Sequence, residues 1–163
     1  MEVHIHIRPA DAADAVRLSE IAFAAKAYWK YPAEWLEKWR TQLTIAERDI
    51  EDDTVVKLTV GVEIAGFYML REDAGKLWLE HLWVEPRFIG RGLGRKLFEH
   101  AVENAGETTF AAIYIESDPN AEGFYAAMGA ERVGESRSEL DGTVRELPLM
   151  EFKLKGRKKG THI

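Results

Sequence analysis

The chain has 163 residues and a net charge of −6, and its length suits one folded domain with a sizeable core. It has no cysteine, which excludes a disulfide framework, a thiolate nucleophile and a thiolate metal site, and its acidic balance argues against general nucleic-acid binding. No apolar run approaches the roughly 20 residues of a membrane span and the N-terminus lacks a signal-peptide pattern, so we expect a cytoplasmic protein with no membrane partner.

The first part of the chain predicts one strand followed by helices. Apolar and polar residues alternate over residues 3–8, which is typical of a strand. Asp11 then offers an N-cap, and a helical pattern continues over residues 12–28. The apolar residues that we expect on the buried face of this helix are Val16, Ile21, Phe23, Ala24 and Ala27.

A second helix and a short third piece are predicted before the main strands. Pro32 fits the first turn of a helix that continues through Leu43. Thr44-Ile45-Ala46-Glu47 has the spacing of a capping box, which indicates the start of the short third piece.

Segments that are rich in β-branched and aromatic residues predict the strands. They are residues 54–62, 65–71, 77–84, 109–116, 131–140 and 144–154. Tight connections are expected at Glu63-Ile64, at Asp73-Ala74-Gly75-Lys76 and at Asp141-Gly142. The strand over residues 77–84 is apolar on both faces, so it should be central and covered on both sides.

The remaining helical patterns cover residues 92–105 and 119–128, with Gly129 placed to end the second helix. The predicted order of elements is therefore β-α-α-β-β-β-α-β-α-β-β, an α/β fold. We predict a single domain over residues 1–154 and a short basic tail over residues 155–163.

A glycine-rich loop follows the central strand. Gly90, Gly92 and Gly94 stand at alternate positions where the strand gives way to a helix. Glycines let backbone N–H groups point toward one place, and a helix N-terminus adds free donors and partial positive charge. This combination predicts a site for a phosphate or diphosphate.

Spacing excludes two common phosphate loops. No Lys-Ser/Thr follows these glycines, as a Walker A loop requires. A dinucleotide fingerprint requires Gly-x-Gly-x-x-Gly, but Leu97 stands where its third glycine would be. The remaining pattern, Gly-x-Gly-x-Gly after Val84-Glu85-Pro86, resembles the acetyl-CoA loop of the GCN5-related N-acetyltransferase (GNAT) superfamily.

A second motif supports this resemblance. Residues 118–130 resemble the GNAT segment Asn-x-x-x-x-Tyr-x-x-x-Gly, with Asn120 and Tyr125 on its named positions. The resemblance implies that Asn120 bonds the pantetheine arm of CoA and that Tyr125 protonates the departing thiolate. The alternative is that Asn120 caps a short helix and Tyr125 is a core aromatic residue.

The resemblance covers nearly the whole chain and implies a mixed, mostly antiparallel central sheet with helices on both faces. It also implies acetyl-CoA as the co-substrate. The residues that it places on the cofactor are Leu82, Trp83, Val84, Ile89, Gly90, Arg91, Gly92, Leu93, Gly94, Arg95, Asn120 and Tyr125. Ile89 departs from the family pattern, which often has Gln or Arg there, so one side-chain contact is in doubt.

Transfer to an amine requires a group that accepts a proton. Glu80 lies among apolar residues of the central strand, where burial would raise its pKa, and it is our prediction for the general base. The alternatives are a structural carboxylate at Glu80, His81 on the opposite face, and Glu116 at the end of the next strand. We expect Asp118 to order the turn into the following helix.

Large aromatic residues cluster between the first two helices. In GNAT proteins these helices form one wall of the acceptor site, so we expect Trp29, Tyr31 or Trp35 to bind the acceptor. We expect no metal, since His4 and His6 have no further residues to complete a ligand set.

The prediction is an N-acetyltransferase that uses direct attack by a primary amine, on a small molecule or on the N-terminus or a lysine of a protein. A sensor that binds CoA without transfer, and an unrelated nucleotide-binding protein, stay open as alternatives. The acceptor is not specified by the sequence, and exposed strands in the C-terminal hairpin favour a homodimer.

Overall fold

The computed structural model describes residues 4–155. The chain divides into two compact units, which are described separately below. The first contains the residues up to Leu70 together with Glu80–Phe98, and the second contains Arg71–Leu79 together with the residues from Glu99 onward. The predicted tail lies outside the described residues, apart from Lys155.

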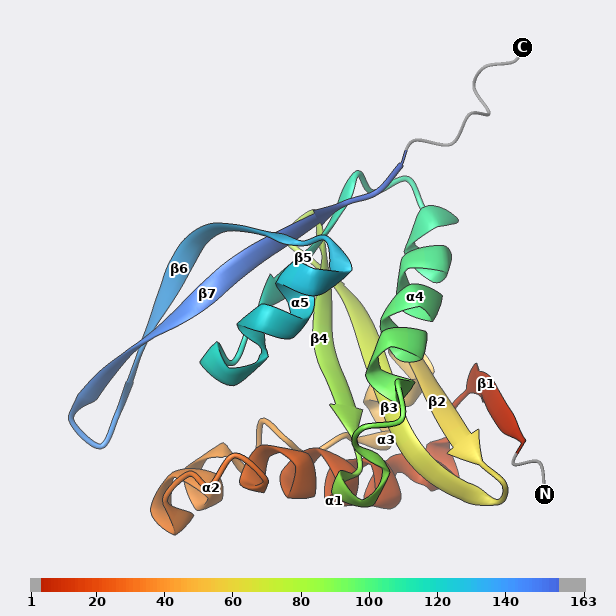
Figure 1. Cartoon of the computed structure of the whole chain (residues 1–163), viewed down its shortest axis with the longest axis horizontal. Helices are drawn as coiled ribbons and strands as arrows, with labels where there is room; N and C mark the ends of the chain where they lie inside the picture. Colours follow the sequence, from red (N-terminus) through yellow and green to blue (C-terminus); the bar gives the residue numbers. More distant parts are fainter. Residues whose placement is uncertain (1–3, 156–163) are drawn as a thin grey trace. The chain divides into compact units, whose positions relative to one another are not determined.

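The elements follow the predicted order with one addition, since the short segment after Thr44 forms a third helix before the second strand (Figure 1). The helices are α1 (Ala15–Ala27), α2 (Ala33–Trp39), α3 (Glu47–Asp52), α4 (Leu93–Gly106) and α5 (Glu122–Met128). The strands are β1 (Ile5–Pro9), β2 (Thr54–Val60), β3 (Glu63–Asp73), β4 (Lys76–Val84), β5 (Ala112–Glu116), β6 (Glu131–Leu140) and β7 (Thr143–Lys153).

The strands hydrogen-bond in the order β1-β2-β3-β4-β5-β7-β6 as one seven-stranded sheet. The pairs β1–β2, β2–β3, β5–β7 and β6–β7 are antiparallel, and β4 runs parallel to β5. The predicted α/β class with a mixed, mostly antiparallel sheet is therefore confirmed.

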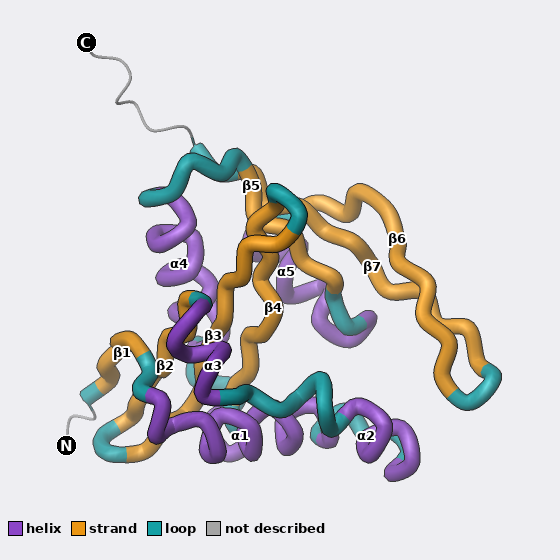
Figure 2. The backbone as a smooth tube through the Cα atoms, turned by 180° about the vertical axis from the view of Figure 1, so that it is seen from behind, coloured by secondary structure: helices purple, strands orange, loops and turns teal. Residues whose placement is uncertain are grey.

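In the first unit, helices lie on both faces of β2 and β3. α4 begins in front of these strands in Figure 1, whereas α3 lies in front of them in the opposite view of Figure 2. The fully buried side chains of this unit include Leu18, Ile21, Leu58, Phe67, Tyr68, Leu93 and Leu97. Burial of such apolar surface is the main force that holds these layers together.

One buried charge belongs to the same core. Lys57 of β2 is 9% exposed, and its Nζ lies 2.8 Å from Oδ2 of Asp14, just before α1. Partial burial alone would raise the pKa of Asp14, but the hydrogen bond from Lys57 and the positive charges of Lys57 and Arg8 hold it below its usual value. The ion pair therefore keeps both charges compensated at neutral pH.

In the second unit, β6 and β7 form a long hairpin that extends beyond α5 (Figure 1). Asp141 and Gly142 both have positive φ angles at its turn, as the Asp-Gly signal predicts. Gly129 adopts the left-handed conformation after Met128 and ends α5, which confirms another sequence prediction.

Some local predictions are wrong. Val16 is 72% exposed, because α1 buries the face that carries Ala15, Leu18, Ala22 and Ala25 instead. The two faces share Ile21, so the helical pattern predicted the helix correctly but not its orientation.

The predicted turns also need correction. The β2–β3 turn lies at Gly61-Val62 rather than at Glu63-Ile64, since Gly61 supplies the positive φ. Thr44 does not cap α3, because its hydroxyl donates to the carbonyl of Arg40 at 2.7 Å. The side chain of Asp49 instead accepts a hydrogen bond from the N–H of Ala46 at 2.8 Å.

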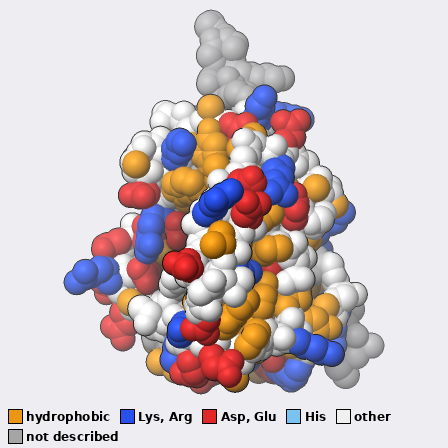
Figure 3. Space-filling view, turned by 90° about the vertical axis from the view of Figure 1, so that its left-hand side faces the viewer, with side chains coloured by type: hydrophobic (Ala, Val, Ile, Leu, Met, Phe, Trp, Pro, Cys, Tyr) orange, Lys and Arg blue, Asp and Glu red, His pale blue; other side chains and the backbone are white. Residues whose placement is uncertain are grey.

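Acidic and basic side chains intermingle with apolar ones on the face drawn in Figure 3. Over residues 4–155, no helix has both the length and the apolar character needed to cross a membrane.

Candidate active site

The glycine loop has the backbone geometry that the sequence predicts. Gly90 and Gly92 have φ angles of +89° and +77°, values that L side chains rarely adopt. A Cβ added at either glycine would meet nothing within 4 Å, so both open onto free space. The loop can therefore bring its main chain close to a ligand.

The loop leads directly into the N-terminus of α4. The N–H of Lys96 donates to the carbonyl of Gly92 at 3.2 Å, which begins the helical hydrogen bonds. The N–H groups of Leu93 and Gly94 precede that bond, and the first N–H groups of a helix have no acceptor inside the helix. These groups and the helix dipole can bind a diphosphate.

Ion pairs and ring contacts hold the chain that enters the loop. The Arg87 guanidinium bridges Glu63 at the start of β3 and Glu85 at the end of β4, with its Nε 3.1 Å from Oε2 of Glu85. The guanidinium of Arg91 lies 5.1 Å from the ring centre of Phe88, which is buried. The entry to the loop is thus anchored on both β3 and a buried aromatic ring.

The end of β4 packs closely against β3. A Cβ at Gly66 would lie 2.7 Å from the carbonyl oxygen of Trp83 and 3.0 Å from Cδ1 of Leu97, so only glycine fits there. The N–H of Glu85 donates to the carbonyl of Ala65 at 2.8 Å. These contacts set the position of the β4 residues that were predicted to bind the cofactor.

The predicted burial of Glu80 is wrong. Its side chain is exposed, and its neighbours on the same face, Trp78, Leu82 and Val84, are only half-buried. Leu77 and Leu79 fill the opposite face, so β4 is not covered equally on both sides as its apolar sequence suggested. The third candidate base, Glu116, is also exposed.

His81 lies in an aromatic cluster on the other face of β4. Its ring centre is 6.0 Å from that of Phe67, and its Nδ1 accepts a hydrogen bond from Nε1 of Trp83 at 2.9 Å. The ring of Trp83 lies 6.2 Å from that of Trp29, at the end of α1. The first unit thus brings together two residues predicted on separate grounds, Trp83 for the cofactor and Trp29 for the acceptor.

The other predicted acceptor residues form a neighbouring group in the same unit. Tyr31 and Trp35 stack with ring centres 6.0 Å apart, and each also contacts the edge or face of Trp39. Trp39 is 8% exposed and anchors this group in the core.

The second unit contains the other two motif residues. Oδ1 of Asp118 accepts hydrogen bonds from the backbone N–H of Asn120 at 2.8 Å and from its Nδ2 at 3.0 Å. Asp118 therefore caps this turn as predicted, and the alternative role of Asn120 as the helix cap is wrong. With Nδ2 bonded to Asp118, the side-chain carbonyl is the group of the Asn120 amide that can accept a hydrogen bond.

Tyr125 is buried in α5, with 7% of its surface exposed. Burial raises the pKa of its phenol, and the negative charge of Asp118 raises it further. The hydroxyl therefore stays protonated at all ordinary pH values. At neutral pH it therefore has a proton to give and cannot act as a base.

The sequence of this chain matches a known protein family. Residues 21–144 match the family model of the acetyltransferase (GNAT) domain. The chain belongs to the GNAT acetyltransferase family.

Two curated GNAT relatives match part of the chain. The peptidyl-lysine N-acetyltransferase YjaB of Salmonella typhimurium is 34% identical over 96 residues, 58% of this chain and 60% of that protein. An uncharacterized N-acetyltransferase in the pepI 3′ region of Lactobacillus delbrueckii subsp. lactis is 33% identical over 89 residues, 48% of this chain and 51% of that protein. The matches thus span between half and three fifths of these relatives.

Solved GNAT structures share the fold over most of this chain. A GCN5-related N-acetyltransferase from Rhodopseudomonas palustris has a TM-score of 0.78 at 21% identity and covers 94% of this chain and 99% of its own. The PaiA N-acetyltransferase of Thermoplasma acidophilum, solved in complex with coenzyme A, has a TM-score of 0.71 at 21% identity, with 92% and 99% covered.

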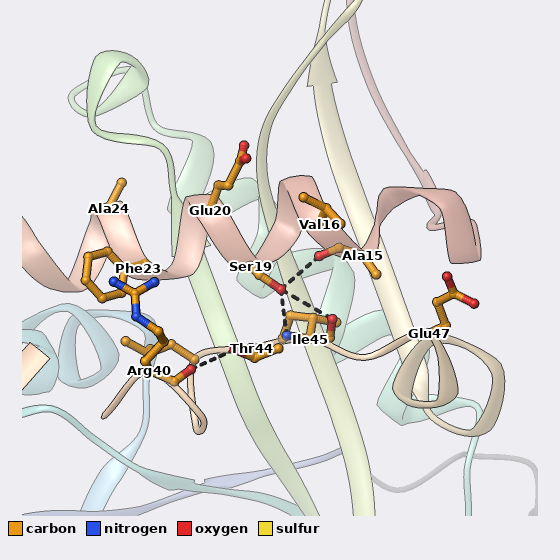
Figure 4. Close-up of a pocket in the computed structure, with 11 residues that line it drawn as sticks. Ala15, Val16, Ser19, Glu20, Phe23, Ala24, Arg40, Thr44, Ile45 and Glu47 are labelled. Carbon is orange, nitrogen blue, oxygen red and sulfur yellow. Dashed lines mark hydrogen bonds between the residues drawn. The ribbon is translucent and has the colours of Figure 1, made fainter. Parts of the chain in front are cut away.

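Two cavities are lined by none of the predicted GNAT residues. One of about 550 Å³ lies between α1 and the segment after α2 (Figure 4), where Ser19 accepts a hydrogen bond from the N–H of Ile45 at 2.8 Å. Another of about 560 Å³ in the second unit includes Tyr114, whose hydroxyl donates to Glu151 at 2.9 Å. Within residues 4–155, no group of three or more His, Asp or Glu residues could hold a metal ion.

Three features of the site escaped the sequence analysis. The bond from Trp83 to His81 was visible only as two aromatic residues at i and i+2, which share a face of a strand. The contact between Trp39 and Tyr31 had no signal in the sequence, because it depends on how the segment between these two residues folds. The second bond of Asp118, to the Asn120 side chain, left no signal beyond their spacing.

Proposed function

We propose that this protein is an N-acetyltransferase that transfers the acetyl group of acetyl-CoA to a primary amine by direct attack. The observation that carries the proposal is the pair of positive-φ glycines, Gly90 and Gly92, at the N-terminus of α4. Acetyl-CoA carries an activated thioester and a diphosphate. The open loop is suited to bind the diphosphate.

The loop over residues 89–95 is proposed to hold the diphosphate through its backbone N–H groups. The main chain of Leu82, Trp83 and Val84 would hydrogen-bond the pantetheine amides in the manner of an added strand. The side-chain carbonyl of Asn120 would accept a hydrogen bond from a pantetheine N–H. Arg91 and Arg95 add positive charge beside the loop.

The proposed chemistry needs two proton transfers. The neutral amine nitrogen attacks the thioester carbon, so a C–N bond forms and the C–S bond breaks. Glu80 accepts the proton that the nitrogen loses, directly or through water, and its exposure leaves it accessible for this role. Tyr125 gives its proton to the departing sulfur, and its raised pKa keeps that proton in place beforehand.

The acceptor is proposed to lie against Trp29, Tyr31 or Trp35. Support comes from the contact between Trp29 and Trp83, which joins the aromatic residues after α1 to the strand proposed for pantetheine. One relative is named a peptidyl-lysine N-acetyltransferase, so lysine side chains belong in the acceptor panel together with small amines and peptide N-termini.

The first test is calorimetric titration with CoA, ATP and NAD. The proposal predicts binding of CoA alone, and Gly92→Ala should weaken it about 5- to 30-fold, since a left-handed residue with a Cβ costs roughly 1–2 kcal/mol. Gly106→Ala is the matched control, because a Cβ there also meets nothing within 4 Å and its φ is not positive. Equal CoA affinity in both variants would remove the loop from the proposal.

The second test is a turnover screen with acetyl-CoA and a panel of amines, read by thiol release. Ala variants at Trp29, Tyr31 and Trp35 should raise KM for the acceptor and leave KM for acetyl-CoA unchanged. CoA binding without turnover of any amine would favour the sensor alternative over the enzyme.

A further inference from the structure

The ammonium group of Lys26 lies over two aromatic rings. Lys26 stands in the last turn of α1, and its Nζ is 4.3 Å from the ring centre of Trp39 and 5.2 Å from that of Tyr31. Both distances fall within the ~6 Å over which a ring face attracts a cation. The structure therefore already holds a primary ammonium at this place.

The rings support one another without help from the lysine. Tyr31 and Trp39 meet edge to face at 4.9 Å and 85°, and Trp35 and Trp39 meet at 5.9 Å and 72°. Such edge-to-face pairs have preferred geometries and add stability beyond the area that they bury. We call Tyr31, Trp35 and Trp39 the aromatic box.

The position of Nζ distinguishes this contact from simple stem packing. A lysine that only covers apolar surface lays its methylene groups on the rings and extends its charge into water. Here the charged nitrogen itself lies above Trp39, which is 8% exposed. Attraction between cation and ring therefore contributes to this contact, and any organic ammonium can supply the same attraction.

Trp35 and Trp39 belong to α2, and Tyr31 lies in the short connection between α1 and α2, two residues after Trp29. Trp29 contacts Trp83 of β4, the strand proposed to bind the pantetheine arm. The box is thus connected, through two residues of chain, to a residue that contacts this strand.

We propose that the aromatic box binds an ammonium group of the acceptor and that Lys26 occupies the box when no acceptor is bound. This inference rests on the proposed transferase function only in identifying the bound ammonium compound as the acetyl acceptor. The attacking amine must be neutral, whereas ring faces favour the charged form. The box therefore holds a second, non-reacting cationic nitrogen, and the acceptor class is a diamine or polyamine.

Lys26 then acts as a tethered competitor. A tethered group competes at an effective concentration in the millimolar range, so it lowers the apparent affinity of a weakly held external cation. Removing the competitor restores the intrinsic affinity, a gain of about tenfold if the box is filled by Lys26 nine-tenths of the time.

The test uses 1,4-diaminobutane as the cationic probe and 1,4-butanediol as its neutral counterpart, with tryptophan fluorescence as the readout. Lys26→Met should tighten diaminobutane binding about tenfold, and Lys26→Arg should not, because arginine keeps a cation on the rings. Lys30→Met is the matched control, since Lys30 is exposed and lies in the same connection between α1 and α2. Circular dichroism verifies that each variant is folded.

Unchanged diaminobutane affinity in Lys26→Met, or an equal response to butanediol, would overturn the cation site. The binding assay needs no acetyl-CoA, so its result is independent of turnover. Failure of the protein to bind CoA would remove the transferase proposal and leave the cation site standing. Turnover of diamines with a KM that Lys26→Met does not lower would remove the cation site alone.

Discussion

The indole Nε1 of Trp83 donates a hydrogen bond to Nδ1 of His81 at 2.9 Å. An indole N–H can only donate, so Nδ1 must be the accepting nitrogen, and the neutral imidazole carries its hydrogen on Nε2. His81 therefore presents a donor rather than a lone pair at Nε2. This argues against His81 as the base in acetyl transfer and leaves Glu80 as our prediction.

The first prediction concerns this tautomer. Two-dimensional ¹⁵N NMR should show His81 in the Nε2–H form, and Trp83→Phe should give a mixture of both forms, because the donor that selects one of them is lost. His100 lies outside this cluster and serves as the internal reference. Observation of the Nδ1–H form in the unmodified protein would contradict the hydrogen bond.

The second prediction concerns Tyr125. Tyr125→Phe should lower kcat about 10²- to 10⁴-fold, the usual contribution of a general acid, with little change in the affinity for acetyl-CoA. Steady-state kinetics and calorimetry measure the two effects separately. Tyr114→Phe is the matched control, since it removes a phenol that donates to Glu151 and has no proposed part in catalysis.

The pH dependence of kcat follows from the raised pKa of Tyr125. A raised pKa means that the phenol keeps its proton above the ordinary value of 10.0, so the acid form is not lost as the pH rises from 8 to 10. We therefore expect that titration of Tyr125 does not lower kcat over this interval. A fall in kcat that is seen in the unmodified protein but absent in Tyr125→Phe would contradict this expectation. Such a fall would mean that another group is the acid or that the phenol is less buried in solution.

Most of the order of elements could be predicted because a long segment with helical or strand periodicity indicates its own secondary structure. The stripe of α4 is one example, since Leu93, Leu97, Phe98, Ala101 and Ala105 are all buried as their spacing indicates. The sequence did not predict which face of α1 is buried. Val16 and Leu18 are both apolar, and only packing against the sheet decides which of them is covered.

The glycine loop was predictable because its backbone conformation depends on the glycines themselves. The environment of Glu80 was not, because a strand that is apolar in sequence need not be covered on both faces. Its burial depends on neighbours from distant parts of the chain. The aromatic box had the same difficulty, since the lysine that fills it lies on a different helix from Trp39.

The third prediction concerns the ion pair between Asp14 and Lys57. Asp14→Asn should lower the free energy of unfolding at pH 7 by about 1–3 kcal/mol, because it removes the nearer counter-charge of the buried Lys57 ammonium and leaves the exposed Asp11, whose Oδ2 lies 3.8 Å away, as its ion-pair partner. Urea denaturation measures the change. Glu20→Gln breaks the exposed pair with Arg17 and should cost less than about 1 kcal/mol.

The same pair gives a pH dependence with a defined sign. The pKa of Asp14 is lowered on folding, so its contribution is complete above the ordinary value of 3.8 and is lost as the pH falls toward the lowered value. The stability difference between the unmodified protein and Asp14→Asn should therefore be constant near neutral pH and shrink below pH 3.8. A constant difference down to strongly acidic pH would show that the carboxylate charge is not its source.

The last prediction concerns Gly66 of β3, which lets this strand pack closely against the end of β4. Gly66→Ala places a methyl group 2.7 Å from the carbonyl oxygen of Trp83, a backbone atom that cannot rotate away. We expect a loss of about 1–3 kcal/mol in unfolding free energy, as for other overpacked sites, together with weaker CoA binding because the main chain of β4 is displaced.

Gly123→Ala provides the contrast for this substitution. Gly123 lies inside α5, and a Cβ there meets nothing within 4 Å, so alanine should stabilise the protein by about 0.5–1 kcal/mol through its higher helix propensity. The two variants make the same chemical change with opposite expected signs in thermal or urea unfolding. If Gly66→Ala proved as stable as the unmodified protein with unchanged CoA affinity, the close packing of β3 against β4 would have no part in positioning the cofactor strand.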